Sequence, residues 1–120
     1  MNNRKTGSGH EERAADYLAQ KGYEILHRNF RGRYGEIDLI ARDPGEDPPC
    51  LVFVEVKYRK NEYSGNPLEA VGIRKQRRIT GTALWYLCRW KIPEETPCRF
   101  DVIGIEGDSI THIKNAFEAS

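Results

Sequence analysis

The sequence predicts an α/β domain with a mixed five-stranded sheet flanked by helices, in the order helix, three strands, helix, two strands. Three observations carry this prediction. A stripe of apolar residues with helical spacing lies near the N-terminus, alternating apolar segments follow it, and a longer helical pattern separates the third strand from the fourth. Successive strands followed by a helical crossover favour a sheet that contains both antiparallel and parallel pairs.

The length and composition of the chain fit one soluble domain. It has 120 residues, of which 38% are hydrophobic and 31% charged, and its formal net charge is +1. We expect residues 1–9 to be a flexible tail and residues 10–120 to form a single domain. No apolar run approaches the ~20 residues of a membrane span, and the N-terminus lacks the apolar stretch of a secretory signal. The sequence therefore predicts a cytoplasmic protein without a membrane partner.

A helix is predicted over residues 11–21. Its apolar stripe consists of Ala14, Ala15 and Leu18. Glu11 precedes Ala15 by one helical turn and Leu18 by two, so its side chain should point inward with the stripe, whereas Glu12 should point toward solvent. The alternative role for Glu11 is a favourable interaction with the helix dipole, worth a few tenths of a kcal/mol.

Five further segments predict strands, because they are apolar throughout or alternate apolar and polar residues. They are residues 23–30, 36–41, 51–59, 99–106 and 110–113. Proline, glycine and aspartate dominate residues 43–49, so the second and third strands should form a hairpin. One helical turn with proline at its first position is predicted over residues 67–71, and a longer helix over residues 73–90.

Charged residues interrupt both strands of this hairpin. Glu36 and Asp38 should share one face of the first strand, because side chains alternate along a strand. By the same rule Glu55, Lys57 and Arg59 should share one face of the second. Burying such groups without partners costs several kcal/mol each. If Asp38 and Glu55 lie on the same face, they can bind one metal ion, and oxygen ligands without histidine or cysteine favour Mg²⁺ or Mn²⁺ over zinc.

Lys57 lies one pleat beyond Glu55, where a lysine can orient or deprotonate a water, or stabilise charge on a phosphate under attack. Carboxylates, a divalent ion and a lysine together predict a phosphodiester hydrolase site. The alternative is a structural ion pair between Lys57 and Glu55. Glu36 lies nearer the turn and is more simply explained as structural. Basic residues flank the acids, which suits a metal site that receives a polyanion. The alternative is ordinary solvated surface charge. The flanking residues are Arg28, Arg31 and Arg33; Lys57, Arg59 and Lys60; Arg74, Lys75, Arg77 and Arg78.

The second helix adds two polar residues near its apolar stripe. Gln76 has the helical spacing to lie at the centre of this stripe with Ile79 and Ala83, and Lys75 lies at the stripe's edge. Tyr86 and Trp90 suit a homodimer interface, which a two-fold symmetric substrate would favour.

Other residues are more simply explained as structural. Asp101 is expected to bind Arg99 or cap a loop. The cysteines lack the spacing of a zinc site and are expected to be reduced thiols that fill space: Cys50, Cys88 and Cys98. The histidines share no ligand spacing and are expected at the surface or in turns: His10, His27 and His112. Several aromatic residues are expected in the core or an interface rather than as platforms for nucleic-acid bases: Tyr17, Tyr23, Tyr34, Trp85 and Trp90.

One pattern resembles the signature of the PD-(D/E)XK nuclease superfamily. It consists of Asp38, the predicted hairpin, and then Glu55-Val56-Lys57. A fuller set of motifs resembles the YraN-like bacterial family, whose members resemble Holliday-junction resolvases. The matching segments, between residues 9 and 117, include Glu11 with Ala14-Ala15, Asn29-Phe30-Arg31, Gly35 to Ala41, Phe53 to Arg59, Lys75-Gln76 and Arg99 to Val102. Two departures stand out. Ile37 replaces the superfamily's proline before Asp38, and His10 precedes Glu11 where the family pattern has glycine.

The resemblance implies a restriction-endonuclease-like core and a Mg²⁺- or Mn²⁺-dependent endonuclease that acts on branched or structured DNA in recombination or repair. By position, Asp38 and Glu55 would be metal ligands, Lys57 the catalytic lysine, and Glu11 a further ligand or an acid that orients one. The residues with supporting or nucleic-acid contacts would be Gln76, Lys75, Glu36 and Arg59. The alternative is a nucleic-acid-binding accessory protein that keeps these residues and does not cleave.

Overall fold

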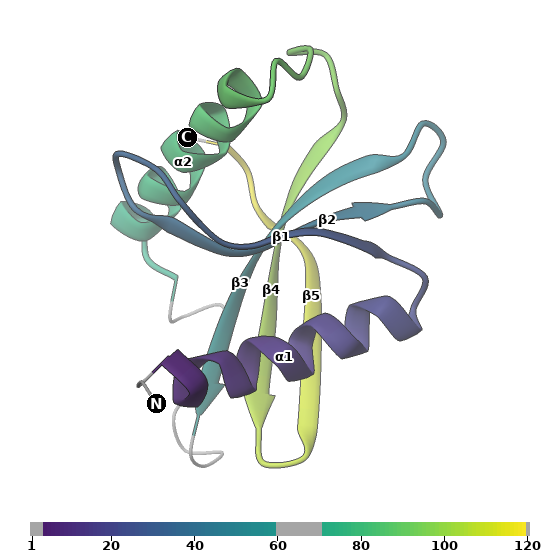
Figure 1. Cartoon of the computed structure of the whole chain (residues 1–120), viewed down its shortest axis with the longest axis vertical. Helices are drawn as coiled ribbons and strands as arrows, with labels where there is room; N and C mark the ends of the chain where they lie inside the picture. The colour runs from purple at the N-terminus through teal and green to yellow at the C-terminus, as the bar shows by residue number, and fades with distance from the viewer. Residues whose placement is uncertain (1–3, 60–70, 120) are drawn as a thin grey trace.

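The computed structural model describes residues 4–59 and 71–119, and the side chains of residues 9–58 and 71–119 (Figure 1). Its elements are α1 (Arg4–Gln20), β1 (Glu24–Arg31), β2 (Glu36–Asp43), β3 (Cys50–Arg59), α2 (Ile73–Arg89), β4 (Cys98–Glu106) and β5 (Ser109–Phe117). This order confirms the predicted succession of helices and strands. No helix in the described ranges is long and apolar enough to cross a membrane.

The five strands form one mixed sheet in the order β1-β2-β3-β4-β5. Neighbouring strands are antiparallel except for β3 and β4, which are parallel and have α2 between them in the chain. The central strand β3 is apolar over its first half because both of its faces are covered there. The mixed sheet with helices on it is the predicted architecture, and it is consistent with a restriction-endonuclease-like core.

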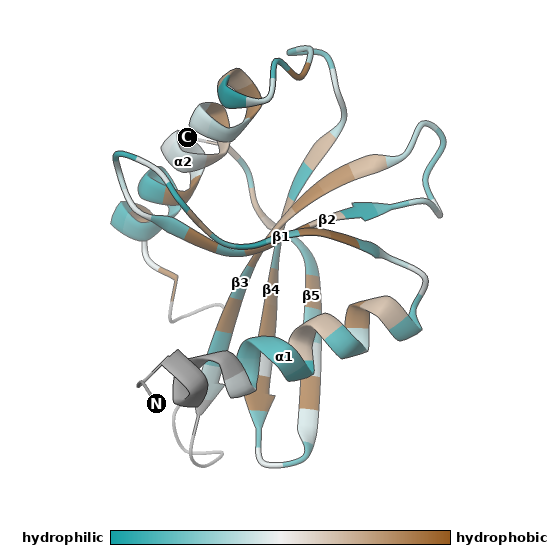
Figure 2. Cartoon of the chain, in the orientation of Figure 1, coloured by the Kyte–Doolittle hydropathy of each residue, from teal (hydrophilic) through white to brown (hydrophobic). Residues whose placement is uncertain are grey.

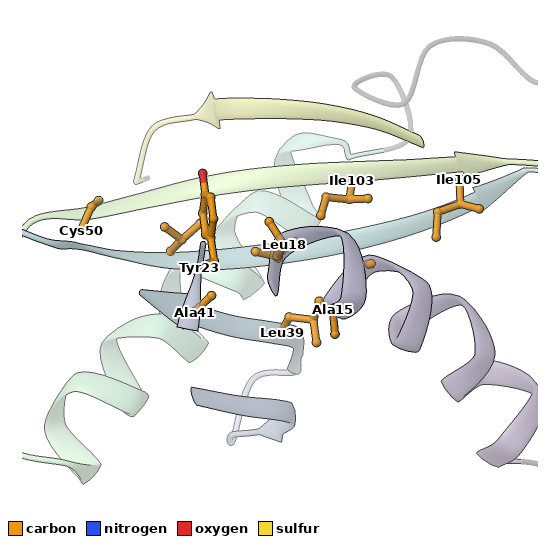
Figure 3. Close-up of a cluster of buried hydrophobic side chains, with 11 residues drawn as sticks. Ala15, Leu18, Tyr23, Leu39, Ala41, Cys50, Ile103 and Ile105 are labelled. Atoms are coloured by element: carbon orange, nitrogen blue, oxygen red, sulfur yellow. The ribbon is translucent and has the colours of Figure 1, made fainter. Parts of the chain in front are cut away.

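Each helix covers one face of the sheet with its own hydrophobic core. The core under α1 (Figure 3) contains Ala14, Ala15, Leu18, Leu39, Val52, Val54 and Ile103. The core under α2 contains Ile40, Phe53, Ile79, Ala83, Tyr86 and Val102. Hydropathy follows this arrangement, since apolar residues concentrate along the central strands while the first turns of α2 are hydrophilic (Figure 2). The N-terminal part of α2 is therefore free to present charge beside the sheet.

Two element boundaries differ from the prediction. α1 begins at Arg4 rather than at the predicted residue 11, because no proline interrupts the segment and helix propensity alone is a weak guide. β5 extends to Phe117, because its polar residues are paired along β4 from Glu106↔Ser109 to Phe100↔Phe117. Most of the helical turn predicted over residues 67–71 lies outside the described residues.

Strict alternation of side chains along β2 breaks at Asp38. Ile37 packs in the core under α2, whereas Leu39 packs in the core under α1. Their partners on β1 are Phe30 and Arg28, and Asn29 between them has a left-handed φ of 51°. The simple rule used to place Glu36 beside Asp38 therefore does not hold here.

Candidate active site

One cavity of about 560 Å³ gathers most of the residues that the sequence singles out. It is lined from α1 by Glu11, from β2 by Glu36 and Asp38, from β3 by Glu55 and Lys57, and from α2 by Lys75. Tyr34 and Gly35 of the β1–β2 turn and Arg78 of α2 complete its rim. Two helices, two strands and one turn thus converge on a single cavity.

Asp38 is held by a hydrogen bond to the neighbouring strand. Its Oδ2 accepts the backbone N–H of Val56 at 2.8 Å, just beyond the last backbone pairing of β2 with β3 at Leu39↔Val54. A side chain thus replaces the backbone partner at the point where the two strands stop pairing. This bond fixes the carboxylate next to Glu55 and leaves its second oxygen for another partner.

Glu55 is the most buried acid of the cavity, with a side chain that is 6% exposed. Its Oε2 lies 2.5 Å from Nζ of Lys75 and 4.0 Å from Nζ of Lys57. The closest cation to Glu55 is therefore on α2 and not on its own strand. Lys57 has an exposed fraction of only 25%, so both lysines reach into the cavity rather than into bulk solvent.

The carboxylates of this cavity act on one another. Burial raises the pKa of Asp38 to about 8, the charge of Glu55 adds to this effect, and the hydrogen bond from Val56 opposes it. Glu11 contributes in the same direction as Glu55. A site that raises the pKa of an aspartate in this way is short of positive charge, and a bound cation would relieve it.

The two lysines have pKa values that shift in opposite directions. Burial lowers the pKa of Lys57, and the charge of Lys75 lowers it further. Burial also opposes the charge of Lys75, but its hydrogen bond and attraction to Glu55 outweigh burial and raise its pKa. Lys75 is therefore the lysine committed to neutralising Glu55, and Lys57 is the one whose proton is more readily given up.

The donor set fits a hard divalent cation such as Mg²⁺ or Mn²⁺, because the cavity offers carboxylate oxygens and neither histidine nor cysteine. Asp38 and Glu55 would hold it, and Glu11 also lines the cavity. In the described part of the chain, however, no three acids, histidines or cysteines are grouped closely enough to bind a metal. Lys75 supplies the positive charge beside Glu55 in this arrangement.

The structure does not bring Gln76 to the cavity, and it does not describe the side chain of Arg59. The side-chain amide of Gln76 donates to the carbonyl of Val71 at 2.9 Å and is not part of the cavity wall. This bond ties the start of α2 to the segment that leads into the helix. The side chain of Arg59 lies outside the described residues. Glu11 does line the cavity, whereas Glu12 is exposed and pairs with Arg28 at 2.8 Å, as their helical spacing predicts.

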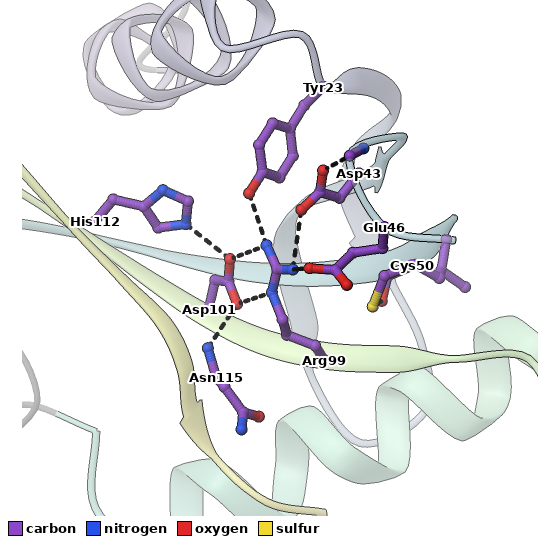
Figure 4. A network of polar contacts seen from close by, with 10 residues as sticks. Tyr23, Asp43, Glu46, Cys50, Arg99, Asp101, His112 and Asn115 are labelled. Carbon is purple, nitrogen blue, oxygen red and sulfur yellow. Dashed lines mark hydrogen bonds and ion pairs between the residues drawn. The ribbon is translucent and has the colours of Figure 1, made fainter. Parts of the chain in front are cut away.

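A second polar cluster lies on the α1 face of the sheet and is structural (Figure 4). Asp101 is fully buried and binds Arg99 at 2.9 Å, as predicted, and it accepts the backbone N–H of Asn115. His112 contacts Asp101 at 2.7 Å with a side chain that is 6% exposed, so its expected surface position is wrong. β5 is rich in polar residues, so apolar periodicity does not show that His112 is buried.

The aromatic residues and the cysteines differ in their burial. Tyr86 is 3% exposed, which rules out a direct role in a dimer interface, while Trp90 remains 48% exposed. Tyr34 and Trp85 are exposed rather than part of the core. All three cysteines are free, but Cys50 alone among them is buried and fills space.

The model of the uncharacterised protein family UPF0102 matches residues 10–105. The chain belongs to the UPF0102 family. This confirms the YraN-like resemblance, and it places the cavity residues from Glu11 to Arg78 within the matched segment.

Curated UPF0102 proteins resemble this chain over nearly its full length. The relative from Lachnoclostridium phytofermentans is 54% identical over 119 residues, covering 99% of this chain and 98% of the relative. The relative from Pelobacter propionicus is 50% identical and covers 97% of this chain and 84% of its own length. The relative from Persephonella marina is 44% identical, with coverages of 93% and 92%. These UPF0102 relatives carry no functional description in their names.

Proposed function

We propose that this protein is a Mg²⁺-dependent endonuclease that hydrolyses phosphodiester bonds in branched or structured DNA. The observation that carries the proposal is the convergence of Asp38, Glu55 and Lys57 on one cavity, with Glu11 on its wall. A pair of acids that can hold a divalent cation, with a lysine in the same cavity, is a residue set that suits metal-assisted phosphodiester hydrolysis.

Each residue has a distinct part in this proposal. Asp38, fixed by the Val56 N–H, and Glu55 hold the cation, which when bound supplies electrostatic stabilisation of the charge that develops on the phosphate. Lys57 holds or accepts a proton at its Nζ, a role that suits the lowering of its pKa by burial and by Lys75. Arg78 also lines the cavity and would contact a phosphate beside the bond that is cleaved.

A second candidate function is a nucleic-acid-binding accessory protein that does not cleave. The contact of 2.5 Å between Lys75 and Glu55 favours it, because this lysine already neutralises one of the two metal-binding acids. The lack of a three-residue metal group among the described residues points the same way.

A cleavage assay separates the two candidates. The protein is incubated with branched, single-stranded and duplex DNA in Mg²⁺, in Mn²⁺ and in a chelator, together with the variants Asp38→Asn and Lys57→Gln. We expect metal-dependent cleavage of branched DNA that falls at least about 100-fold in each variant. The exposed residues Asp108 and Lys114 provide matched controls, Asp108→Asn and Lys114→Gln, that should retain activity.

If none of the substrates is cleaved, the proposed endonuclease activity is contradicted. Cleavage that survives in both cavity variants would also contradict it. The accessory function predicts instead a salt-dependent affinity for DNA that persists in the two variants, because arginines outside the acid pair would carry the binding.

A further inference from the structure

The turn between β1 and β2 is packed against the outer face of α2 at two glycines. A Cβ added at Gly32 would lie 3.0 Å from Cδ1 of Trp85, and one added at Gly81 would lie 3.3 Å from Cδ2 of Tyr34. Each aromatic side chain therefore contacts the opposite element where that element has no side chain. The turn and the helix are joined by these reciprocal contacts, which hold Tyr34 in place.

Tyr34 is fixed by this packing but is not covered by it. Its exposed fraction is 59%, the highest among the exposed large hydrophobic residues described, and that of Trp85 is 44%. Tyr34 lines the active-site cavity and also two hollows outside it. One, of about 390 Å³, contains Arg31 and Arg33, and the other, of about 290 Å³, contains Arg77 and Arg78. An aromatic ring thus stands where three hollows meet.

The arginines around Tyr34 are exposed and largely without acidic partners. Arg31 lies 3.9 Å from Glu36. Among the described side chains, no carboxylate forms an ion pair with the others, namely Arg33, Arg77 and Arg78. Unneutralised arginines on both sides of an exposed aromatic ring match a strand of nucleic acid, whose phosphates alternate with flat bases.

We propose that Tyr34 and these four arginines bind unpaired nucleotides of a DNA strand next to the bond that is cleaved. The base of one nucleotide stacks on the Tyr34 ring, and its neighbouring phosphates contact Arg31 and Arg33 on one side and Arg77 and Arg78 on the other. This inference rests on the proposed function and defines its substrate class. The bases of a continuous duplex are stacked on one another, so a junction, flap or single strand fits and an intact duplex does not.

A second copy of the chain is a poorer occupant of this surface. A two-fold axis through it would bring the same four arginines of each copy together, and like charges across an interface are destabilising. The surface is complementary to a polyanion and not to itself.

The test measures DNA binding by fluorescence anisotropy in a chelator, so that no cleavage occurs. One labelled single strand carries all its bases, and a matched strand has abasic sites at its central positions but the same phosphates. We expect the wild-type protein to prefer the strand with bases by roughly 5- to 150-fold, the range expected for stacking of one base on an aromatic side chain. Tyr34→Phe should keep this preference, and Tyr34→Leu should abolish it.

The same experiment contains its folding control. Tyr34→Leu should bind the abasic strand as well as the wild type does, because the arginines are unchanged. Arg77→Ala should instead weaken binding to both strands and reduce the salt dependence by about 0.7 in the slope of log K against log salt, as expected for the loss of one phosphate contact.

Equal affinity of the wild type for the two strands would overturn the proposal, as would a base preference that persists in Tyr34→Leu. Tighter binding to an intact duplex, or to RNA of the same sequence, would also overturn it. Failure here is distinct from failure of the enzyme, because the binding test contains no metal. A base preference without cleavage would refute the nuclease and keep this site, and cleavage without a base preference would do the reverse.

Discussion

The carboxyl group of Asp38 couples the candidate site to the pH dependence of folding. Burial and the nearby Glu55 raise its pKa from 3.8 to about 8. Between these two values the folded protein binds more protons than the unfolded chain, so its stability falls as the pH rises. Ionised Asp38 is thus a source of instability that the fold tolerates at a position suited to a cation.

Asp38→Asn should remove this pH dependence while keeping an oxygen that can accept the Val56 N–H. We expect the variant to be more stable than the wild type above about pH 8 by more than about 1 kcal/mol, since one unit of pKa shift corresponds to about 1.4 kcal/mol. Near pH 4 the difference should be small. Urea denaturation of both proteins at several pH values measures it, and parallel pH profiles would contradict the assignment.

Lys75 should stabilise the fold by neutralising Glu55. Lys75→Gln leaves a nearly buried carboxylate with Lys57 4.0 Å away as its remaining cation. We expect a loss of about 1–2 kcal/mol, less than for a fully buried pair because solvent reaches Lys75. Denaturant unfolding gives the value. Arg74→Gln, one residue away on the exposed surface of α2, is the matched control and should change stability by less than about 0.5 kcal/mol.

At the scale of elements, the contact between the β1–β2 turn and α2 predicts opposite effects for two glycines. Gly81→Ala should be neutral or stabilising by up to about 1 kcal/mol, because alanine favours the helix and the exposed Tyr34 ring has to give way by only a few tenths of an ångström, which keeps it in its packed position. Gly32→Ala should be destabilising by about 1–2 kcal/mol, because its Cβ meets both Trp85 and Thr82. Thermal unfolding distinguishes them, and a shift of the same sign in both would refute this packing.

The helices and strands, and the proximity of Asp38 to Glu55, could be predicted because they depend on local patterns in the sequence. Periodicity reports which residues face a core, and the loop between β2 and β3 allows only a hairpin, so Asp38 and Glu55 had to lie near each other. Helical spacing likewise separates the inward Glu11 from the exposed Glu12. These are local relationships within one element or between adjacent strands.

The remaining features depend on how distant elements dock. Lys75 reaches Glu55 because α2 packs on the sheet with its first turn beside β3, and no spacing in the sequence encodes that placement. The partnership of His112 with Asp101 depends on the pairing of β5 with β4, which includes an irregularity between Phe100 and Val102. Tyr34 was expected in the core or an interface, but its exposure depends on the packing of the β1–β2 turn against the outer face of α2, which no local pattern encodes.

At the scale of the whole molecule, two acidic centres give the stability opposite pH slopes. The bonds of Asp101 to His112 and Arg99 outweigh its burial and hold its pKa below the ordinary value of 3.8. Its contribution is therefore present above that value and lost as the pH falls through the folded pKa. The raised pKa of Asp38 has the opposite effect: it makes the stability of the fold decrease as the pH rises from 3.8 to about 8. The fold should be most stable between these limits, in mildly acidic solution.

Asp101→Asn tests the acidic side of this profile. The side chain is fully buried and Arg99 would lose its nearest carboxylate, so we expect a loss of about 3–5 kcal/mol at neutral pH that becomes smaller in acid. Chemical denaturation across acidic pH measures the loss. The exposed turn residue Asp108 gives the control Asp108→Asn, which should follow the wild type. An Asp101→Asn protein with wild-type stability would show that the cluster in Figure 4 does not stabilise the fold.

The hydrogen bond from Val56 to Asp38 has a consequence for the genetics of this protein. One carboxylate both takes part in the proposed chemistry and joins two strands of the sheet. An alanine at position 38 would leave a backbone N–H of β3 without its partner, so a cell carrying it would lose folded protein as well as activity. Complementation experiments that need an inactive but intact copy should therefore use Asp38→Asn, and the amount of protein in the cell should be measured alongside the phenotype.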